Sequence, residues 1–101
     1  MPIVLFQEDG IWFAHCAALE ITGYGHTENE AKDSFEIMLK EFFRYAEENG
    51  NLHDELKRLG WQVEARTPPP FEKLISRDET LKRIFDTKPV RTVLEPIPAY
   101  A

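Results

Sequence analysis

The longest amphipathic pattern in the chain begins after Thr27 and ends near Asn49-Gly50. Its apolar residues recur at steps of three and four, which places them on one face of a helix: Ala31, Phe35, Met38, Leu39, Phe42 and Ala46, widened by Phe43 and Tyr45. Thr27 and Glu30 have the spacing of a capping box, and Asn-Gly is a common helix stop. The pattern predicts a long amphipathic helix that covers a sheet.

Three short β-prone segments precede this helix, at residues 2–7, 11–16 and 21–26. The Glu8-Asp9-Gly10 turn between the first two predicts a hairpin. The third segment carries Gly23 and Gly25 on the same face. Two glycines weaken a strand by themselves but allow another element to approach closely. We expect the long helix to pack over them; a flat patch for a partner's backbone is the alternative.

The chain after the long helix predicts a second, shorter helix from residue 51 or 52, with Leu52, Leu56 and Leu59 on one face and Gly60 as its stop. Apolar and polar residues then alternate over residues 61–65, which predicts a fourth strand. A helical crossover is long enough to place that strand parallel to a neighbour. Residues 1–66 are therefore predicted to form an α+β domain of order β-β-β-α-α-β: a three-stranded antiparallel meander, a long and a short helix, and a fourth strand.

Residues 67–101 are predicted to form a connector and a short mixed C-terminal tail. Pro68, Pro69 and Pro70 favour an extended polyproline connector. Residues 71–75 and 78–85 have short helical patterns, the second capped by Asp78, and residues 90–94 form a β-prone run. The tail has too few apolar residues for a core of its own. We expect it to dock on the main body or on a second copy, with residues 90–94 added to a sheet edge of either, and we expect a homodimer.

The charge is acidic and unevenly distributed. The chain holds 12 basic and 18 acidic residues, a net charge of −6. Residues 1–66 contain 6 basic and 13 acidic side chains (−7), and residues 67–101 contain 6 and 5 (+1). Negative charge disfavours direct nucleic-acid binding by the first part and attracts a basic protein partner, although it also serves solubility alone. The tail shows no basic recognition helix, so DNA binding is not expected.

The composition also indicates the compartment. A single cysteine allows no internal disulfide, which fits a reducing environment. The opening sequence MPIVLFQEDG lacks the basic region of a signal peptide, and no apolar stretch reaches membrane-spanning length. These features predict a soluble, cytoplasmic protein.

The chain contains three histidines and one cysteine that could bind a metal ion or take part in catalysis. His15 and Cys16 are adjacent and point to opposite faces of a strand, and a site built from Cys16 and His26 lacks further ligands. We therefore predict a buried, inert cysteine and surface imidazoles. Two-metal hydrolysis needs converging carboxylates, whereas Glu8, Asp9, Glu20 and Glu64 sit in turns or at an alternating strand position. We predict neither enzyme activity nor a cofactor.

One family pattern is matched by eight residues in the first two-thirds of the chain: Phe13, Ala14, Cys16, Leu19, Gly25, Thr27, Glu30 and Ala31. Through these residues the chain resembles the HicB-like family, the antitoxins of bacterial toxin–antitoxin pairs. The chain departs from it at Ala17, where the family usually has proline, and at Ile21, near a usual glycine. The resemblance implies a partial ribonuclease H-like fold that binds and masks a small basic HicA-like ribonuclease toxin without catalysis.

By this resemblance the contact surface comes from the sheet and the long helix, with Glu28, Asp33, Glu36 and Glu41 facing the toxin. Masking would be steric and electrostatic. Two alternatives remain open: a stand-alone HicB-like scaffold or regulator without a toxin, motivated by the atypical tail, and a metal-dependent ribonuclease H-like hydrolase.

Overall fold

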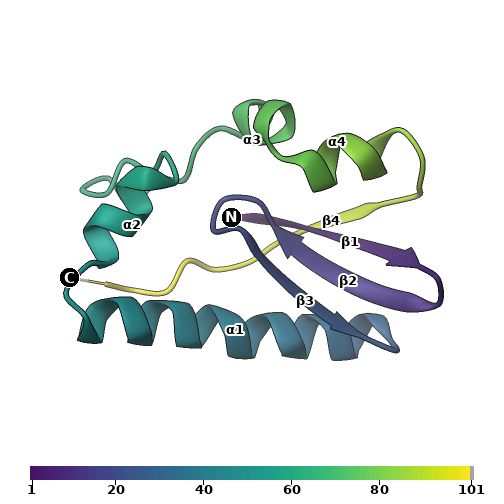
Figure 1. The fold of residues 1–101 in the computed structure, drawn as a ribbon, viewed down its shortest axis with the longest axis horizontal. Coiled ribbons are helices and arrows are strands. Elements are labelled where there is room, and N and C mark those ends of the chain that lie inside the picture. The colour runs from purple at the N-terminus through teal and green to yellow at the C-terminus, as the bar shows by residue number, and fades with distance from the viewer. Residues whose placement is uncertain (101) are drawn as a thin grey trace.

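The computed structural model describes residues 1–100, which form one sheet and four helices (Figure 1). The elements in chain order are β1 (Pro2–Glu8), β2 (Ile11–Cys16), β3 (Ile21–Gly25), α1 (Glu28–Glu48), α2 (Leu52–Arg58), α3 (Phe71–Arg77), α4 (Glu79–Phe85) and β4 (Arg91–Leu94). The strand order is β3-β2-β1-β4, and every pair of neighbours is antiparallel. The predicted α+β class and its opening meander are confirmed.

The predicted hairpin joins β1 to β2 through a two-residue turn. Asp9 and Gly10 have φ values of 51° and 79°, and Glu8 pairs with Ile11. Positive φ at both central positions is the type I′ geometry that matches the twist of the flanking strands. Farther along the ladder Phe6 stacks on Phe13, with their ring centroids 5.2 Å apart. The turn and this cross-strand pair together fix the register.

Helix α1 begins at the predicted capping box. The Thr27 hydroxyl accepts a hydrogen bond from the Glu30 amide at 3.1 Å, and the Glu30 carboxylate accepts one from the His26 amide at 3.0 Å. Five apolar residues of α1 are buried: Ala31, Phe35, Leu39, Phe43 and Ala46. Met38 and Tyr45, which the periodicity placed on the apolar face, are 41% and 65% exposed. They lie at the margin of that face, where the sheet no longer covers the helix.

The two glycines of β3 face α1, as expected. A Cβ atom on Gly23 would lie 2.3 Å from the Phe35 nitrogen and 2.6 Å from the Ala31 oxygen, and one on Gly25 would lie 2.4 Å from the Glu30 Cβ. Both distances from Gly23 lead to helix backbone, which has little freedom to move. The helix therefore packs directly on the strand, and any side chain at Gly23 would separate them.

The predicted strand at residues 61–65 is wrong. Trp61 and Val63 are buried and Gln62 and Glu64 exposed, so the alternation correctly reported burial. The segment forms a tight turn instead, closed by an isolated bridge between Gln62 and Thr67. The fourth strand is β4, from the tail, and it runs antiparallel to β1, not parallel. Because β4 takes the free edge of β1, residues 61–65 have no strand to pair with there.

The tail docks on the main body. Figure 1 shows α1 on one side of the sheet and α3 and α4 on the other, and the last residues return along α1. Leu74, Leu81, Ile84 and Tyr100 belong to the same hydrophobic cluster as the strands. The Tyr100 hydroxyl donates to the Val63 carbonyl at 3.0 Å. Burial on both faces explains why the apolar run of β1 is continuous rather than alternating.

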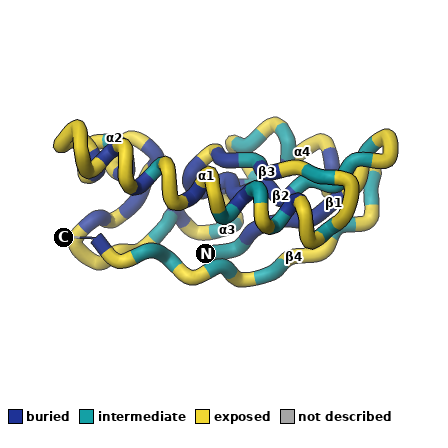
Figure 2. The backbone as a smooth tube through the Cα atoms, turned by 90° about the horizontal axis from the view of Figure 1, so that it is seen from below, coloured by how far each residue is buried: buried dark blue, intermediate teal, exposed yellow. Residues whose placement is uncertain are grey.

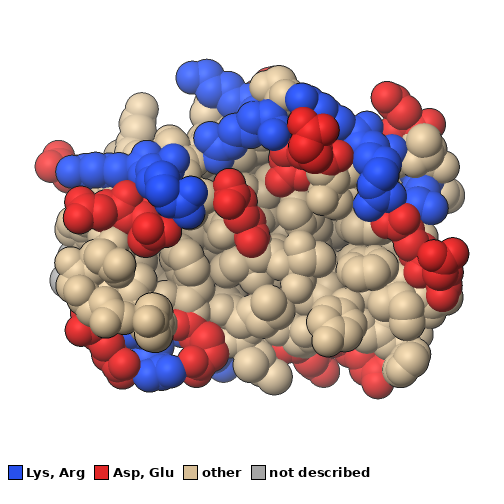
Figure 3. Space-filling view, in the orientation of Figure 1, with Lys and Arg blue, Asp and Glu red and all other residues tan. Residues whose placement is uncertain are grey.

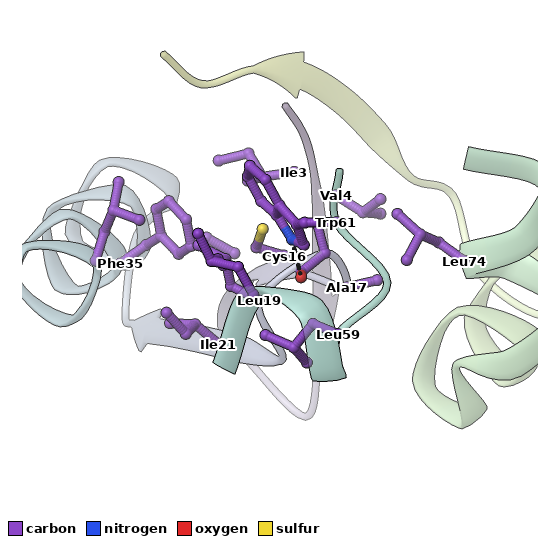
Figure 4. Packing of buried hydrophobic residues seen from close by; sticks show 14 of the residues in the cluster. Ile3, Val4, Cys16, Ala17, Leu19, Ile21, Phe35, Leu59, Trp61 and Leu74 are labelled. Carbon is purple, nitrogen blue, oxygen red and sulfur yellow. Dashed lines mark hydrogen bonds between the residues drawn. The ribbon is translucent and has the colours of Figure 1, made fainter. Parts of the chain in front are cut away.

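Figure 4 shows the part of the core where Trp61, which follows α2, lies beside the β2–β3 connection. There the Trp61 indole donates a hydrogen bond to the Ala18 carbonyl at 2.9 Å. The bond satisfies the one polar group of a side chain that is only 4% exposed. Among residues 1–100, no helix combines the length and the apolar character that crossing a membrane requires.

Candidate functional site: the acidic surface of helix α1

Helix α1 accounts for −4 of the net charge of −6. Its 21 residues include seven acidic and three basic side chains. In Figure 3 acidic side chains line the lower edge, where α1 lies in Figure 1, whereas lysines and arginines gather along the upper edge over α3 and α4. The molecule is therefore electrically polarised across the sheet, and α1 forms its negative side.

The four predicted contact residues lie on different sides of α1. Successive residues on a helix are turned by about 100°, so Glu28, Asp33, Glu36 and Glu41 spread around the axis. Asp33 and Glu41 are exposed, and Glu28 and Glu36 are half-buried. The structure does not gather the four carboxylates into one patch: two face the returning tail, and two face solvent.

Glu28 and Glu36 contact the C-terminal segment. The Glu28 carboxylate forms an ion pair with Arg91 of β4. Glu36 faces the half-buried Glu95; partial burial, followed by the hydrogen bond and the negative charge of Glu36, raises the pKa of Glu95 to about 7. The Met1 amino group donates to the Glu95 carbonyl at 2.7 Å and lies near enough to lower this pKa slightly. Glu28 therefore helps hold the tail, and Glu36 does so while Glu95 is protonated.

Glu41 belongs to an exposed ion-pair network on the solvent side of α1. Arg44 contacts Glu41 at 2.6 Å and Glu48 at 2.9 Å. The hydrogen bond and the charge of Arg44 lower the pKa of the Glu41 carboxyl. Exposed pairs of this kind contribute little to stability, so the network can rearrange at low cost when a partner supplies a cation. Asp33, two turns earlier, is exposed to solvent.

A buried polar network, absent from the sequence prediction, lies on the opposite face of the sheet. His15 Nε2 is 2.9 Å from an Asp78 carboxylate oxygen, and His15 Nδ1 is 2.7 Å from the Thr22 hydroxyl. The other Asp78 oxygen accepts from the Leu81 amide at 2.9 Å and so caps α4. A neutral imidazole with its proton on Nε2 satisfies both contacts. The network clamps α4 to β2 and β3.

His15 is therefore not the surface imidazole that we predicted, because it is only 6% exposed. Its burial depends on α4, which lies 63 residues away in the chain. The sequence did indicate that Asp78 caps a helix. Only one carboxylate oxygen of Asp78 makes the cap, and the neighbouring sequence does not show that the other oxygen contacts His15. His26 and His53 are exposed, as predicted.

Cys16 is buried, as predicted. Its side chain is fully enclosed, and burial raises the pKa of the thiol to about 11. A nucleophilic cysteine requires a thiolate, so this thiol is unsuited to catalysis at neutral pH. Its sulfur lies 3.7 Å from the Met1 sulfur within the core.

The acids outside α1 do not converge on a metal site. Glu8 binds Arg83 through both carboxylate oxygens at 2.8 Å, and this contact lowers its pKa. Within the described part of the chain, no group of three or more histidine, cysteine, aspartate or glutamate side chains is arranged to hold a metal ion. The geometry therefore offers no support for the metal-dependent hydrolase alternative.

Comparisons with known proteins do not assign the chain to a family. No protein-family model, no curated protein and no solved structure matches it.

Proposed function

We propose that this protein is an interaction protein of the HicB-like antitoxin type, which binds a small basic ribonuclease and masks its RNA-binding surface. The proposal joins two lines of support. The first is the resemblance of residues 13–31 to the family pattern. The second is the acidic outer surface of α1.

The charge of α1 is the observation that carries the proposal. Seven carboxylates against three cations on one exposed helix produce a negative potential on one side of the molecule. A ribonuclease binds a polyanion and therefore presents a positive surface. Complementary potentials accelerate the encounter and exclude wrong partners. A helix laid across such a surface would displace RNA by occupying its place, with no reaction required.

Of the four predicted contact residues, Asp33 and Glu41 are the ones that a partner reaches first, because both are exposed. A basic side chain that approaches Glu41 replaces Arg44 in its ion pair. Glu28 is available only when Arg91 releases it. We therefore expect the partner to contact the solvent side of α1 more strongly than the side that faces the tail.

Co-purification tests the proposal. The chain is expressed together with any small basic protein encoded beside its gene, and the complex is isolated at low salt. Asp33→Lys should weaken the complex, whereas Glu64→Lys, which makes the same charge change at an exposed turn away from α1, should leave it intact. Failure to retain any small basic protein would contradict the masking function and favour a stand-alone scaffold.

A further inference from the structure

A second surface of the molecule is apolar and exposed. The β3-edge surface consists of Tyr24, Ile37, Met38 and Tyr45, which are 65%, 65%, 41% and 65% exposed. The Tyr24 amide donates to the Ser34 hydroxyl at 3.3 Å, so the Ser34 side of α1 lies along the outer edge of β3. Residues three or four apart on a helix are neighbours, so Ile37 and Met38 extend this side from Ser34. Tyr45 continues it one turn beyond Glu41.

Charges of opposite sign border this surface. Figure 3 shows a broad uncharged area between the acidic lower edge over α1 and the basic upper edge over α3 and α4. Glu41 and Glu48 follow Ser34 at steps of seven residues and so lie at the α1 border. Helices α3 and α4 together hold four basic and two acidic side chains. The surface therefore has an apolar centre, one negative border and one positive border. When a second copy is rotated by 180° about an axis parallel to these borders, its positive border faces the negative border of the first copy.

We propose that a second copy of this chain docks on the β3-edge surface about a twofold axis parallel to α1. Such a rotation places the acidic border of each copy against the basic border of the other and brings the two apolar centres together. A twofold dimer uses the same patch on both subunits, which is the condition that this charge pattern meets. The inference does not rest on the proposed masking function, although the two surfaces share the Glu41 carboxylate.

The available area and the state of the two sheet edges support this choice of surface. The molecule measures 38 × 26 Å across the face seen in Figure 3, and a specific interface needs about 800 Å² on each partner. The opposite sheet edge is β4 (Figure 2), which has only four residues and lies between Pro89 and Pro96. Short strands and prolines protect an edge against pairing. The contact at β3 is made by side chains, since Ser34 already binds the Tyr24 amide.

Sedimentation velocity of the full chain over a range of concentrations tests the proposal. We expect a mass of twice 11.8 kDa for the natural chain. Tyr45→Ser and Met38→Ser should each raise the dissociation constant about tenfold, since central apolar contacts dominate interfaces. Leu94→Ser is the matched control, because Leu94 is 81% exposed on β4 at the opposite edge. It should leave the dimer unchanged.

A mixing experiment tests the charge arrangement. One variant reverses the acidic border (Glu41→Lys with Glu48→Lys), and the other reverses the basic border (Lys73→Glu with Lys82→Glu). Each variant should repel itself and sediment as a monomer. Their mixture should associate, because every reversed border then meets an opposite charge. Circular dichroism confirms that both variants are folded.

Three results would overturn the inference. The first is a natural chain that stays monomeric at all concentrations; if that monomer still binds a basic protein, only the dimer is wrong and the masking function stands. The second is a dimer that Leu94→Ser disrupts and Tyr45→Ser does not. The third is a natural dimer whose two charge-reversed variants fail to associate when mixed.

Discussion

Gly23→Ala should be the most damaging single-methyl addition in the sheet. The new Cβ would lie 2.3 Å from the Phe35 nitrogen, 2.6 Å from the Ala31 oxygen and 2.7 Å from the Phe35 Cα. Ordinary contacts between carbon atoms are about 3.5–4.0 Å, so the overlap is about 1 Å at several atoms. All three obstacles are helix backbone. Relief therefore requires α1 as a whole to move away from β3.

That movement opens a fully buried part of the core. Ala31, Phe35 and Leu39 are 0%, 0% and 2% exposed beneath α1. Overpacking in a core costs about 1–3 kcal/mol, and rigid neighbours place this site near the upper value, at about 3 kcal/mol. For a domain of this size, 1 kcal/mol lowers Tm by about 4 °C. The expected fall in Tm is therefore about 12 °C.

Urea and thermal unfolding followed by far-ultraviolet circular dichroism measure this cost. Gly50→Ala is the control, because Gly50 has φ +68° with no atom within 4 Å of an added Cβ. It carries only the backbone cost of a left-handed residue, about 1–2 kcal/mol. If Gly23→Ala costs no more than Gly50→Ala, the close approach of helix and strand is not the constraint that we describe.

Three further predictions concern buried or half-buried groups. His15→Ala leaves the half-buried Asp78 carboxylate without this partner and should cost about 2 kcal/mol in urea unfolding. Glu95→Gln should flatten the pH dependence of stability: a pKa raised from 4.5 to about 7 in the folded state stabilises most below pH 4.5, and this contribution is lost as pH rises to about 7. Cys16 should resist a thiol reagent in the native protein and react at once in denaturant, because its thiol is buried with a pKa of about 11.

Each of these predictions has a control. His26→Ala removes an exposed imidazole and should change stability by less than about 0.5 kcal/mol; an equal loss in both variants would remove the case for the clamp. The pH comparison is made as a difference between the natural chain and Glu95→Gln, so that other titrating groups cancel; parallel curves would refute the raised pKa. Rapid native labelling of Cys16 would show that the core opens readily there.

Local signals located most of the elements. The Thr27–Glu30 spacing fixed the start of α1 because both partners of a capping box lie within one turn. The Asp9-Gly10 turn fixed the first hairpin for the same reason: its φ values are a property of two adjacent residues. The two glycines of β3 correctly predicted that α1 packs closely on this strand. Each of these interactions spans only a few residues or a strand and the helix that follows it.

The interpretation of residues 61–65 was wrong for a different reason. Alternation reports which side chains are buried, and Trp61 and Val63 are buried. It does not report whether an unpaired strand edge is within reach. Here β4 pairs with Pro2–Leu5 and occupies the only other side of β1. Residues 61–65 and β4 lie about 30 residues apart in the chain, and which of them pairs with β1 depends on the whole fold.

The candidate site shows the same division. The sequence alone determined the acidity of α1 and the exposure of Asp33 and Glu41, because charge and helical periodicity are local properties. Only the tertiary structure decided that Glu28 and Glu36 face the tail, that His15 is buried against Asp78, and that acidic and basic borders flank one apolar surface. These outcomes depend on where the segment after the prolines docks on the main body. The free energy of that docking is a sum over contacts between residues far apart in the sequence, so no short segment reveals it.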